Sequence, residues 1–345
     1  MTPRARNVLI VGVVSALVVG LGLAWNDAGD YTIRAPRVDA LPQVDGTRDA
    51  AWDAVEGKRI PLRGSISRVP HVDISALHDG NEICVLLRWP DRTESLDRTP
   101  WEFDGATWQK LDAKDCYEDK AAFYWPITEC AEFNAVGCSA LCHSGGGQSG
   151  GLHEETGWPG MLNAGSHYAL LEGELLDEWH WKATRTDPFG QVDDGHLTGD
   201  RPTDEHEKGG RFGDETKAAG GGYKDNATDD QSKPSHDFAE ADRAGLLLKA
   251  TDAAPIGDYG RYSPGDRVPA LLLAPLEGKR ADISGKGAWA DGEWTLEIRR
   301  KLSTGDPNDV SFASGDGRHP FGVAIFEGQQ FDHSYSVCVQ WLELE

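Results

Sequence analysis

The sequence has little methionine, few basic residues and no long helical pattern after its N-terminal segment. Two methionines occur among 345 residues, and 57 acidic residues outnumber 34 lysines and arginines, which gives a formal net charge of −23. Such a negative surface repels nucleic-acid phosphates and anionic lipid, so neither is an expected partner. The sequence also shows no nucleophile–base pair, phosphate-binding loop or paired catalytic acids. We therefore expect a protein that is not itself an enzyme.

Residues 1–29 have the pattern of an export segment. Arg4 and Arg6 precede an apolar run over residues 8–25, and positive charge before such a run predicts that the rest of the chain is exported. About 18 residues at roughly 1.5 Å each just span a hydrocarbon core of about 30 Å. This length favours a membrane anchor, although the small residues at 22–24 also suit signal cleavage. Either reading predicts an extracytoplasmic location, in the periplasm or on the outer face of the cell membrane.

Cys138, Cys142 and His143 form the motif with the most specific chemistry. Two cysteines followed at once by histidine are typical of covalent haem attachment, in which the thiols add to the vinyl groups and the imidazole binds iron. Three residues separate these cysteines instead of the usual two, and Ser139 and Ala140 are small enough for the loop to absorb the extra one. The motif predicts haem c on Cys138 and Cys142, with His143 as the proximal ligand. A local disulfide or a zinc site are the alternatives, and zinc would require further ligands.

Short alternating segments over residues 31–126 and 267–344 predict antiparallel strands. The expected fold is mainly β, an antiparallel β-sandwich over residues 30–345 with long inserted loops. Residues 187–245 are rich in glycine and acidic side chains and poor in large apolar ones, which predicts a loop insertion. Such an insertion would cover a haem edge, contact a partner subunit, or be a solvated acidic segment.

One strand is predicted downstream of the cysteine–histidine loop, around residues 176–188. Alternation places Trp179 and Trp181 on one face and His180 and Lys182 on the other. By itself this pattern predicts an aromatic core face and a polar face exposed to solvent.

Taken together, the motifs resemble the haem-binding gamma-subunit family of ethylbenzene dehydrogenase, which accompanies molybdenum enzymes of the dimethyl sulfoxide reductase superfamily. Nitrite oxidoreductase and the perchlorate, selenate and some nitrate reductases have similar subunits. The resemblance covers most of residues 36–345 and depends on the order of the pieces, since no single piece is specific. The pieces are residues 44–46, 50–52, 72–80, 83–89, 122–126, 138–143, 179–183, 294–302 and 321–326.

The resemblance implies particular iron ligands. In the family a methionine and the lysine of the Trp-x-Trp-Lys strand hold a non-covalent haem b, and that lysine corresponds to Lys182. A cysteine–histidine loop stands here where a methionine-bearing loop is expected. This departure implies one covalent haem with His143 proximal and Lys182 distal. Met161 is the rival distal ligand, His167 and His180 are further alternatives, and a second, non-covalent haem b between Met161 and Lys182 stays open.

The resemblance also implies a function, namely a c-type cytochrome subunit for electron transfer. It would relay single electrons between a molybdenum catalytic subunit with its iron–sulfur subunit and another cytochrome or a quinone-linked carrier. Two strong axial ligands leave no open site on iron, which favours electron transfer over substrate chemistry. The alternatives are a carbohydrate- or ligand-binding β-sandwich module, a b-type haem carrier, and a haem enzyme with an open coordination site.

The remaining cysteines and histidines carry weaker signals. Four cysteines lie outside the motif, and in an oxidising compartment Cys116–Cys130 and Cys84–Cys338 make one of three possible pairings. His333 is expected to donate a hydrogen bond at a strand end and not to bind metal.

Overall fold

The computed structural model describes residues 31–64, 67–140, 173–199, 211–216, 218–239, 247–313 and 317–345. The predicted N-terminal helix over residues 1–29 lies outside this part of the chain. Within it, none of the helices combines the length and apolar character needed to cross a membrane. The described chain is mainly antiparallel β, so the predicted fold class is confirmed.

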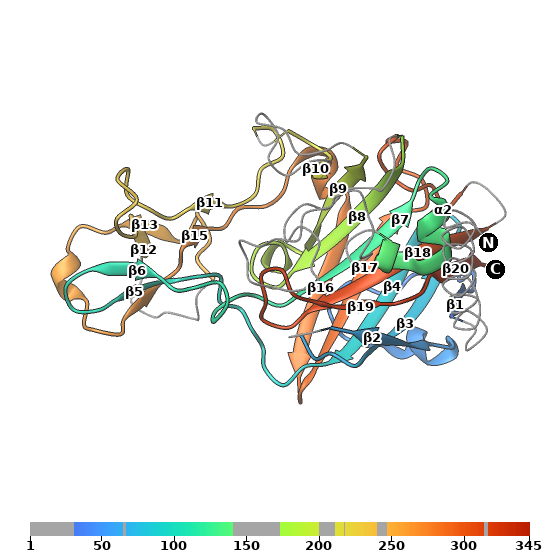
Figure 1. The fold of residues 1–345 in the computed structure, drawn as a ribbon, viewed down its shortest axis with the longest axis horizontal. Helices are drawn as coiled ribbons and strands as arrows, with labels where there is room; N and C mark the ends of the chain where they lie inside the picture. The colour runs from blue at the N-terminus through green and yellow to red at the C-terminus, as the bar shows by residue number, and fades with distance from the viewer. Residues whose placement is uncertain are drawn as a thin grey trace, which may run out of the picture.

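The elements belong to two groups of strands and a few short helices (Figure 1). The main sheet contains β1 (Thr32–Ala35), β2 (Lys58–Arg63), β3 (His71–His78), β4 (Glu82–Pro90), β7 (Lys120–Pro126), β8 (Leu175–Lys182), β9 (Gln191–Thr198), β10 (Arg211–Gly213), β16 (Ile283–Ala290), β17 (Glu293–Lys301), β18 (Arg318–Phe326), β19 (Ser334–Ser336) and β20 (Gln340–Leu344). The other strands are β5 (Trp101–Phe103), β6 (Trp108–Lys110), β11 (Lys224–Asp225), β12 (His236–Phe238), β13 (Ala253–Pro255), β14 (Arg267–Val268) and β15 (Leu271–Leu272). The helices include α2 (Ala131–Val136) and the 3-10 helices η1 (Ala50–Ala54), η2 (Gly137–Ala140), η4 (Asp187–Phe189), η5 (Tyr259–Arg261) and η6 (Gly278–Ala281).

The main sheet is a sandwich whose edges close into a barrel. One layer has the order β2-β3-β4-β17-β16, the other has the order β9-β8-β7-β18, and β19 links β18 to β2. The pairings at the corners are short: β16 with β9, β18 with β19, and β19 with β2 each join two residue pairs. At one side β1 pairs in parallel with β20, so strands from the two ends of the described chain lie side by side (Figure 1). This arrangement confirms that both halves of the sequence build one sandwich.

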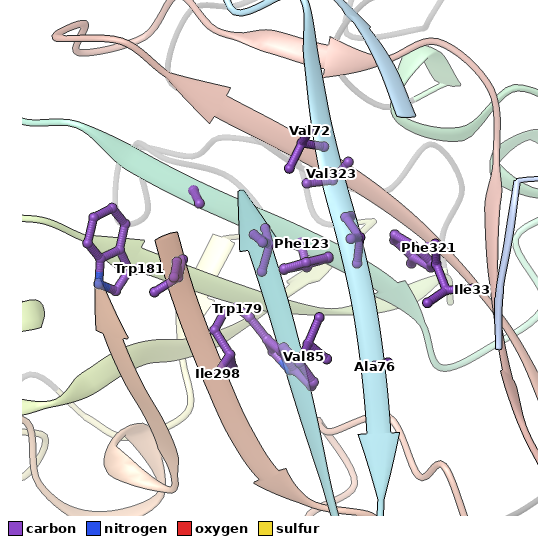
Figure 2. Close-up of a cluster of buried hydrophobic side chains, with 14 of the residues drawn as sticks. Ile33, Val72, Ala76, Val85, Phe123, Trp179, Trp181, Ile298, Phe321 and Val323 are labelled. Atoms are coloured by element: carbon purple, nitrogen blue, oxygen red, sulfur yellow. The ribbon is translucent and has the colours of Figure 1, made fainter. Parts of the chain in front are cut away.

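Aromatic side chains fill the space between the layers. Trp179 and Trp181 of β8 are fully buried there, as the alternation of that strand predicts (Figure 2). The ring centroid of Trp181 lies 5.1 Å from that of Trp294 and 6.0 Å from that of Trp89, both in edge-to-face geometry. Such large buried aromatic rings dominate the energetics of a core.

A smaller lobe extends from the sandwich, at the left of Figure 1. Its sheet β14-β5-β6 packs around Trp101, Trp108 and Tyr262. The rings of Trp108 and Tyr262 lie 4.9 Å apart and almost perpendicular, and the Trp101 Nε1 donates a hydrogen bond to the Asn226 carbonyl over 2.7 Å. Two stretches of sequence that are far apart therefore meet in a second apolar cluster.

The structure corrects the prediction that residues 187–245 form a loop insertion. Residues 191–198 are strand β9, which pairs with β8 and β16 inside the sandwich. The strand was missed because Asp194, whose side chain faces inward, stands where a core strand ordinarily has an apolar residue. The later part of the segment contributes short strands, among them β10, β11 and β12.

The predicted disulfides are also wrong. The described cysteines are all free thiols: Cys84, Cys116, Cys130, Cys138 and Cys338. Cys84 is fully buried in β4, in the apolar cluster beneath η1, whereas Cys338 lies against Gly137. The Cys116 thiol donates to the Asp97 carboxylate over 3.2 Å. The two partners of the predicted Cys84–Cys338 pair therefore lie in different parts of the fold.

Candidate functional site

The outward face of the layer β9-β8-β7-β18 carries buried polar groups. In the register of the strands His180 lies opposite Ala122, and Ala122 lies opposite Ala324, with all three side chains buried. One row further along, Lys182 lies opposite Lys120, and Lys120 lies opposite Phe326. We call this surface the outer face. The polar side of β8 is therefore not the solvent-exposed surface that the alternation alone predicts.

Lys182 is held at the outer face by an ion pair. It is 4% exposed, and its Nζ donates to the Asp193 carboxylate of β9. Burial lowers the pKa of Lys182, although Asp193 opposes that shift. Arg280 also binds Asp193, with its Nε 2.6 Å from Oδ1 and its Nη2 2.9 Å from Oδ2. Because Arg280 would remain as the counterion of Asp193, breaking the Lys182–Asp193 ion pair does not leave a buried carboxylate unpaired.

His180 presents a ring nitrogen with no hydrogen-bond partner. Its Nδ1 accepts from Arg211 Nη2 at 2.9 Å, while the buried Nε2 is unpaired. Burial lowers the pKa of His180 well below its usual value, and the cations Lys182 and Arg211 act in the same direction. The imidazole is therefore neutral. Since a guanidinium only donates, the proton lies on Nε2, and this tautomer does not offer Nε2 as an iron ligand.

The outer face concentrates positive charge in a strongly acidic chain. Lys120, Lys182 and Arg185 are buried there, and the side chain of Arg211 is 28% exposed. Arg211 binds Glu178 through two contacts of 2.7 and 2.9 Å, and Arg185 is paired with Glu118. Lys120 has no such carboxylate pair among the described contacts: its Nζ donates to the Gln330 carbonyl over 2.8 Å and lies 4.0 Å from the Phe326 ring centroid. Burial lowers the pKa of Lys120 well below its usual value.

Cys138 also contacts the outer face, at the end of the strands that lies away from Lys182. The α2–η2 segment brings its thiol against Gly322 of β18, where a Cβ would lie 2.2 Å from the sulfur. Gly322 is opposite Tyr124 of β7, so Cys138 is two strands and four residues from Lys182. Strand spacings of about 4.8 Å and a rise of about 3.4 Å per residue separate the Cα atoms of Gly322 and Lys182 by roughly 17 Å. Burial raises the pKa of the Cys138 thiol to about 12.

The other predicted ligands lie outside the described residues. These are Cys142, His143, Met161 and the alternative His167. His333 is described, and its Nδ1 lies 2.8 Å from the Phe331 carbonyl, to which it donates. The prediction of a hydrogen-bond donor is confirmed for His333. The centroid of its ring lies 4.7 Å from that of Phe326, at the edge of the outer face.

Sequence reasoning missed several residues of the outer face. Asp193 and Arg211 lie in the segment interpreted as a loop insertion, and Arg280 lies in a short 3-10 helix within the range predicted as strands. Lys120 is the first residue of β7, of which only residues 122–126 entered the resemblance. The signal for Lys120 was present, because it lies one alternation step from Ala122 on the same face. The pairing of Asp193 with Lys182 depends on strand order, which the sequence does not reveal.

The contact between Cys138 and Gly322 can be tested by a double-mutant cycle. Gly322→Ala should lower the free energy of unfolding by about 1–3 kcal/mol, because the new methyl group overpacks the sulfur. Cys138→Ala in the same chain should restore part of that loss, since the sulfur is removed. Denaturant unfolding of the four proteins measures the coupling. Additive effects would show that the two residues are not in contact.

The fold places the chain in the class of antiparallel β-sandwich proteins. The family model described as "Ethylbenzene dehydrogenase" matches residues 23–338, and the chain belongs to this family. The family suggested by the ordered motifs is thereby confirmed.

Other comparisons add little. A search of curated protein sequences finds no significant match. Similar solved structures include a family 9 carbohydrate-binding module from Caldicellulosiruptor kristjanssonii in complex with glucose, at 8% identity, covering 90% of this chain and 95% of that chain with a TM-score of 0.34. The same module with cellotriose matches at 10% identity, 91% and 93% coverage and a TM-score of 0.34. A putative carbohydrate-binding protein from Bacteroides uniformis matches at 7% identity, 92% and 100% coverage and a TM-score of 0.35. TM-scores this low support no inference about a ligand.

Proposed function

We propose that this chain is a haem-carrying electron-transfer subunit of a molybdenum-containing oxidoreductase complex. One observation carries the proposal: Cys138 and Lys182 are 44 positions apart in the sequence, yet both are buried at the outer face. Membership of the ethylbenzene dehydrogenase family supports an accessory role beside catalytic and iron–sulfur subunits. The N-terminal charge pattern supports an extracytoplasmic location, with residues 1–29 as anchor or signal.

The described residues fit a haem at the outer face. Lys182 supplies a buried amine whose pKa is lowered, which favours the neutral form that binds iron. Lys120 has a buried amine with no carboxylate partner in the described contacts, and a haem propionate beside it would supply that partner and favour its charged form. Phe326 and His333 add ring surfaces beside it. Haem bound here supplies one-electron redox chemistry.

The proposed covalent attachment uses Cys138 and Cys142, with His143 as proximal and Lys182 as distal ligand. A thioether at Cys138 has no proton to lose, so its sulfur can stay in the apolar cluster that contains Phe133. Lys182 ranks ahead of His180 because Arg211 fixes the unsuitable tautomer of that histidine. Met161 is the remaining distal alternative.

The proposal is tested by a pyridine haemochrome spectrum after acid–acetone extraction. Full-length protein from a host that matures c-type cytochromes should keep its haem and give a c-type spectrum. Cys138→Ala and Cys142→Ala should each remove one thioether link, which shifts the haemochrome band toward that of haem b. Cys84→Ala is the matched control, since Cys84 is buried outside the motif and should leave the spectrum unchanged.

Two other results would contradict parts of the proposal. Haem that extracts completely would indicate a b-type site, with electron transfer retained and covalent attachment lost. Protein that contains no haem at all would overturn the electron-transfer function. A carbohydrate- or ligand-binding module would then be the better interpretation, and binding of soluble glucans would be the next measurement.

A further inference from the structure

A second cluster of buried polar groups lies inside the sandwich, on the opposite side of β8 from the outer face. Asp177 of β8, Asp194 of β9 and Asp309 of the segment after β17 each place one carboxylate oxygen within 4.8 Å of the others. The three residues are 0%, 1% and 6% exposed. Three carboxylates this close together and this far from water repel one another strongly unless something neutralises them.

The oxygens that face this cluster have no donors. Neither oxygen of Asp194 accepts from an N–H or hydroxyl donor, and its polar neighbour is the Asp282 carboxyl group. Oδ1 of Asp177 and Oδ1 of Asp309 also lack such a donor. Asp214 is a fourth carboxylate at this position: its side chain is 0% exposed, it interacts with Asp309, and its Oδ2 is unpaired. Buried polar atoms in proteins are almost always paired, so several orphaned oxygens that converge on one point indicate a missing partner.

The charges indicate what that partner is. Oδ2 of Asp177 accepts from the Arg300 guanidinium at 2.6 Å, from the Trp179 Nε1 at 3.1 Å and from the Val310 amide at 2.9 Å. Arg300 therefore neutralises one of the three negative charges. Asp214 has its own partner in His196, which contacts the other carboxylate oxygen. When ionised, Asp177, Asp194 and Asp309 then carry a net charge of −2, which a single divalent cation balances. Asp282, beside Asp194, adds a further negative charge that favours a cation here.

The donor set selects the type of cation. All the orphaned atoms are carboxylate oxygens, the hard ligands that Ca²⁺ takes in sets of 6–8 oxygens, whereas structural zinc prefers sulfur and nitrogen. Asp282 lies within hydrogen-bonding distance of Asp194 and brings a further carboxylate. Ligands contributed by separate segments with variable spacing suit the flexible coordination of Ca²⁺ better than the strict octahedron of Mg²⁺.

We propose that Asp177, Asp194 and Asp309 form a calcium site, with Asp214 and Asp282 as additional ligands or their supports. The ion would join β8, β9 and the segment after β17 at the inner side of the layer. This inference is independent of the haem, because it concerns the other face of β8. The competing explanation is that protons shared between neighbouring carboxyl groups replace the ion, since burial raises the pKa of Asp194 well above its usual value.

Thermal unfolding of the full-length protein distinguishes the two explanations. After treatment with EGTA, calcium at about 100 times its dissociation constant should raise Tm by roughly 5 °C, and equal magnesium should do much less. Asp194→Asn and Asp309→Asn should each abolish the shift. Asp39→Asn, which makes the same change of charge at an exposed position, should keep it. A wild-type Tm that does not respond to calcium would overturn the proposal.

Terbium luminescence gives a second readout, which does not depend on the stability of the variants. Trp179 donates a hydrogen bond to Asp177, so excitation of tryptophan should sensitise Tb³⁺ bound beside it. We expect terbium emission from the EGTA-treated protein that calcium displaces with one-site stoichiometry, and at least a tenfold weaker signal from folded Asp194→Asn. Emission of equal strength from Asp194→Asn and Asp39→Asn would place the ion elsewhere and contradict the assignment.

Discussion

Replacement of Arg300 by methionine is expected to lower the free energy of unfolding by about 3–5 kcal/mol. Both side chains of the Arg300–Asp177 pair are 0% exposed, so the substitution leaves a buried carboxylate without its counterion. It also removes a hydrogen bond to the Val310 carbonyl and the packing of the guanidinium against Trp179, whose ring centroid is 5.1 Å away. Chemical unfolding in the presence of EGTA measures the loss without any contribution from calcium.

An exposed ion pair is the matched control for this change. Arg59 and Asp73 form two contacts of 2.8 Å, but the side chain of Arg59 is 65% exposed. Solvent screens such a pair, so Arg59→Met should lower the free energy of unfolding far less than Arg300→Met does. Equal losses for Arg300→Met and Arg59→Met would show that the buried pair has no special role. A double substitution of Arg300 and Asp177 should be less destabilising than the sum of the single ones.

Replacement of Lys182 by alanine is expected to open the distal position of the haem iron. Reduced wild-type protein should not bind carbon monoxide, whereas reduced Lys182→Ala should bind it with a clear change in the Soret band. The midpoint potential should also move, by on the order of 0.1 V, because axial ligands tune it strongly. This result depends on the proposed function, and absorption spectroscopy with redox titration measures it.

Lys120→Ala is the control for the Lys182 variant. Lys120 lies opposite Lys182 in the strand register and is as deeply buried, so both variants remove one buried lysine side chain from the outer face. Only the loss of an iron ligand should permit carbon monoxide binding. If both variants bind it equally, the effect comes from loosening of the outer face. If neither variant does, Lys182 is not the distal ligand and Met161 becomes the leading candidate.

The sequence predicts the general fold because alternation along the strands is strong where they line the aromatic core. On β8 the alternation correctly assigned Trp179 and Trp181 to the interior. It was misleading for Lys182, because alternation identifies opposite faces but does not show whether a face is covered. Lys182 is 4% exposed, and only the structure shows this.

Strand β9 shows a different limit of sequence reasoning. Hydrophobic periodicity detects a strand only when the inward side chains are apolar, and here Asp194 points inward. The inward carboxylate of Asp194 interrupts the hydrophobic periodicity of the strand, and the same carboxylate is a ligand of the proposed calcium site. The small lobe was hidden by its size, since β5, β6, β12 and β13 have only three residues each. The prediction of the disulfides was wrong because cysteine pairing depends on the distances between thiols in the folded chain, which the sequence does not reveal.

Because the side chains of β8 alternate between two different faces, the fold should tolerate an insertion or deletion within this strand far less well than a point substitution. Asp177 faces the interior beside Arg300, whereas the next residue, Glu178, faces outward beside Arg211. Loss or gain of one residue within β8 would exchange the two faces over part of the strand, bringing lysine into the aromatic core and tryptophan to the outer face. Point substitutions impair one face at a time. Among related chains we therefore expect β8 to vary in its side chains but to keep a fixed number of residues between Asp177 and Lys182.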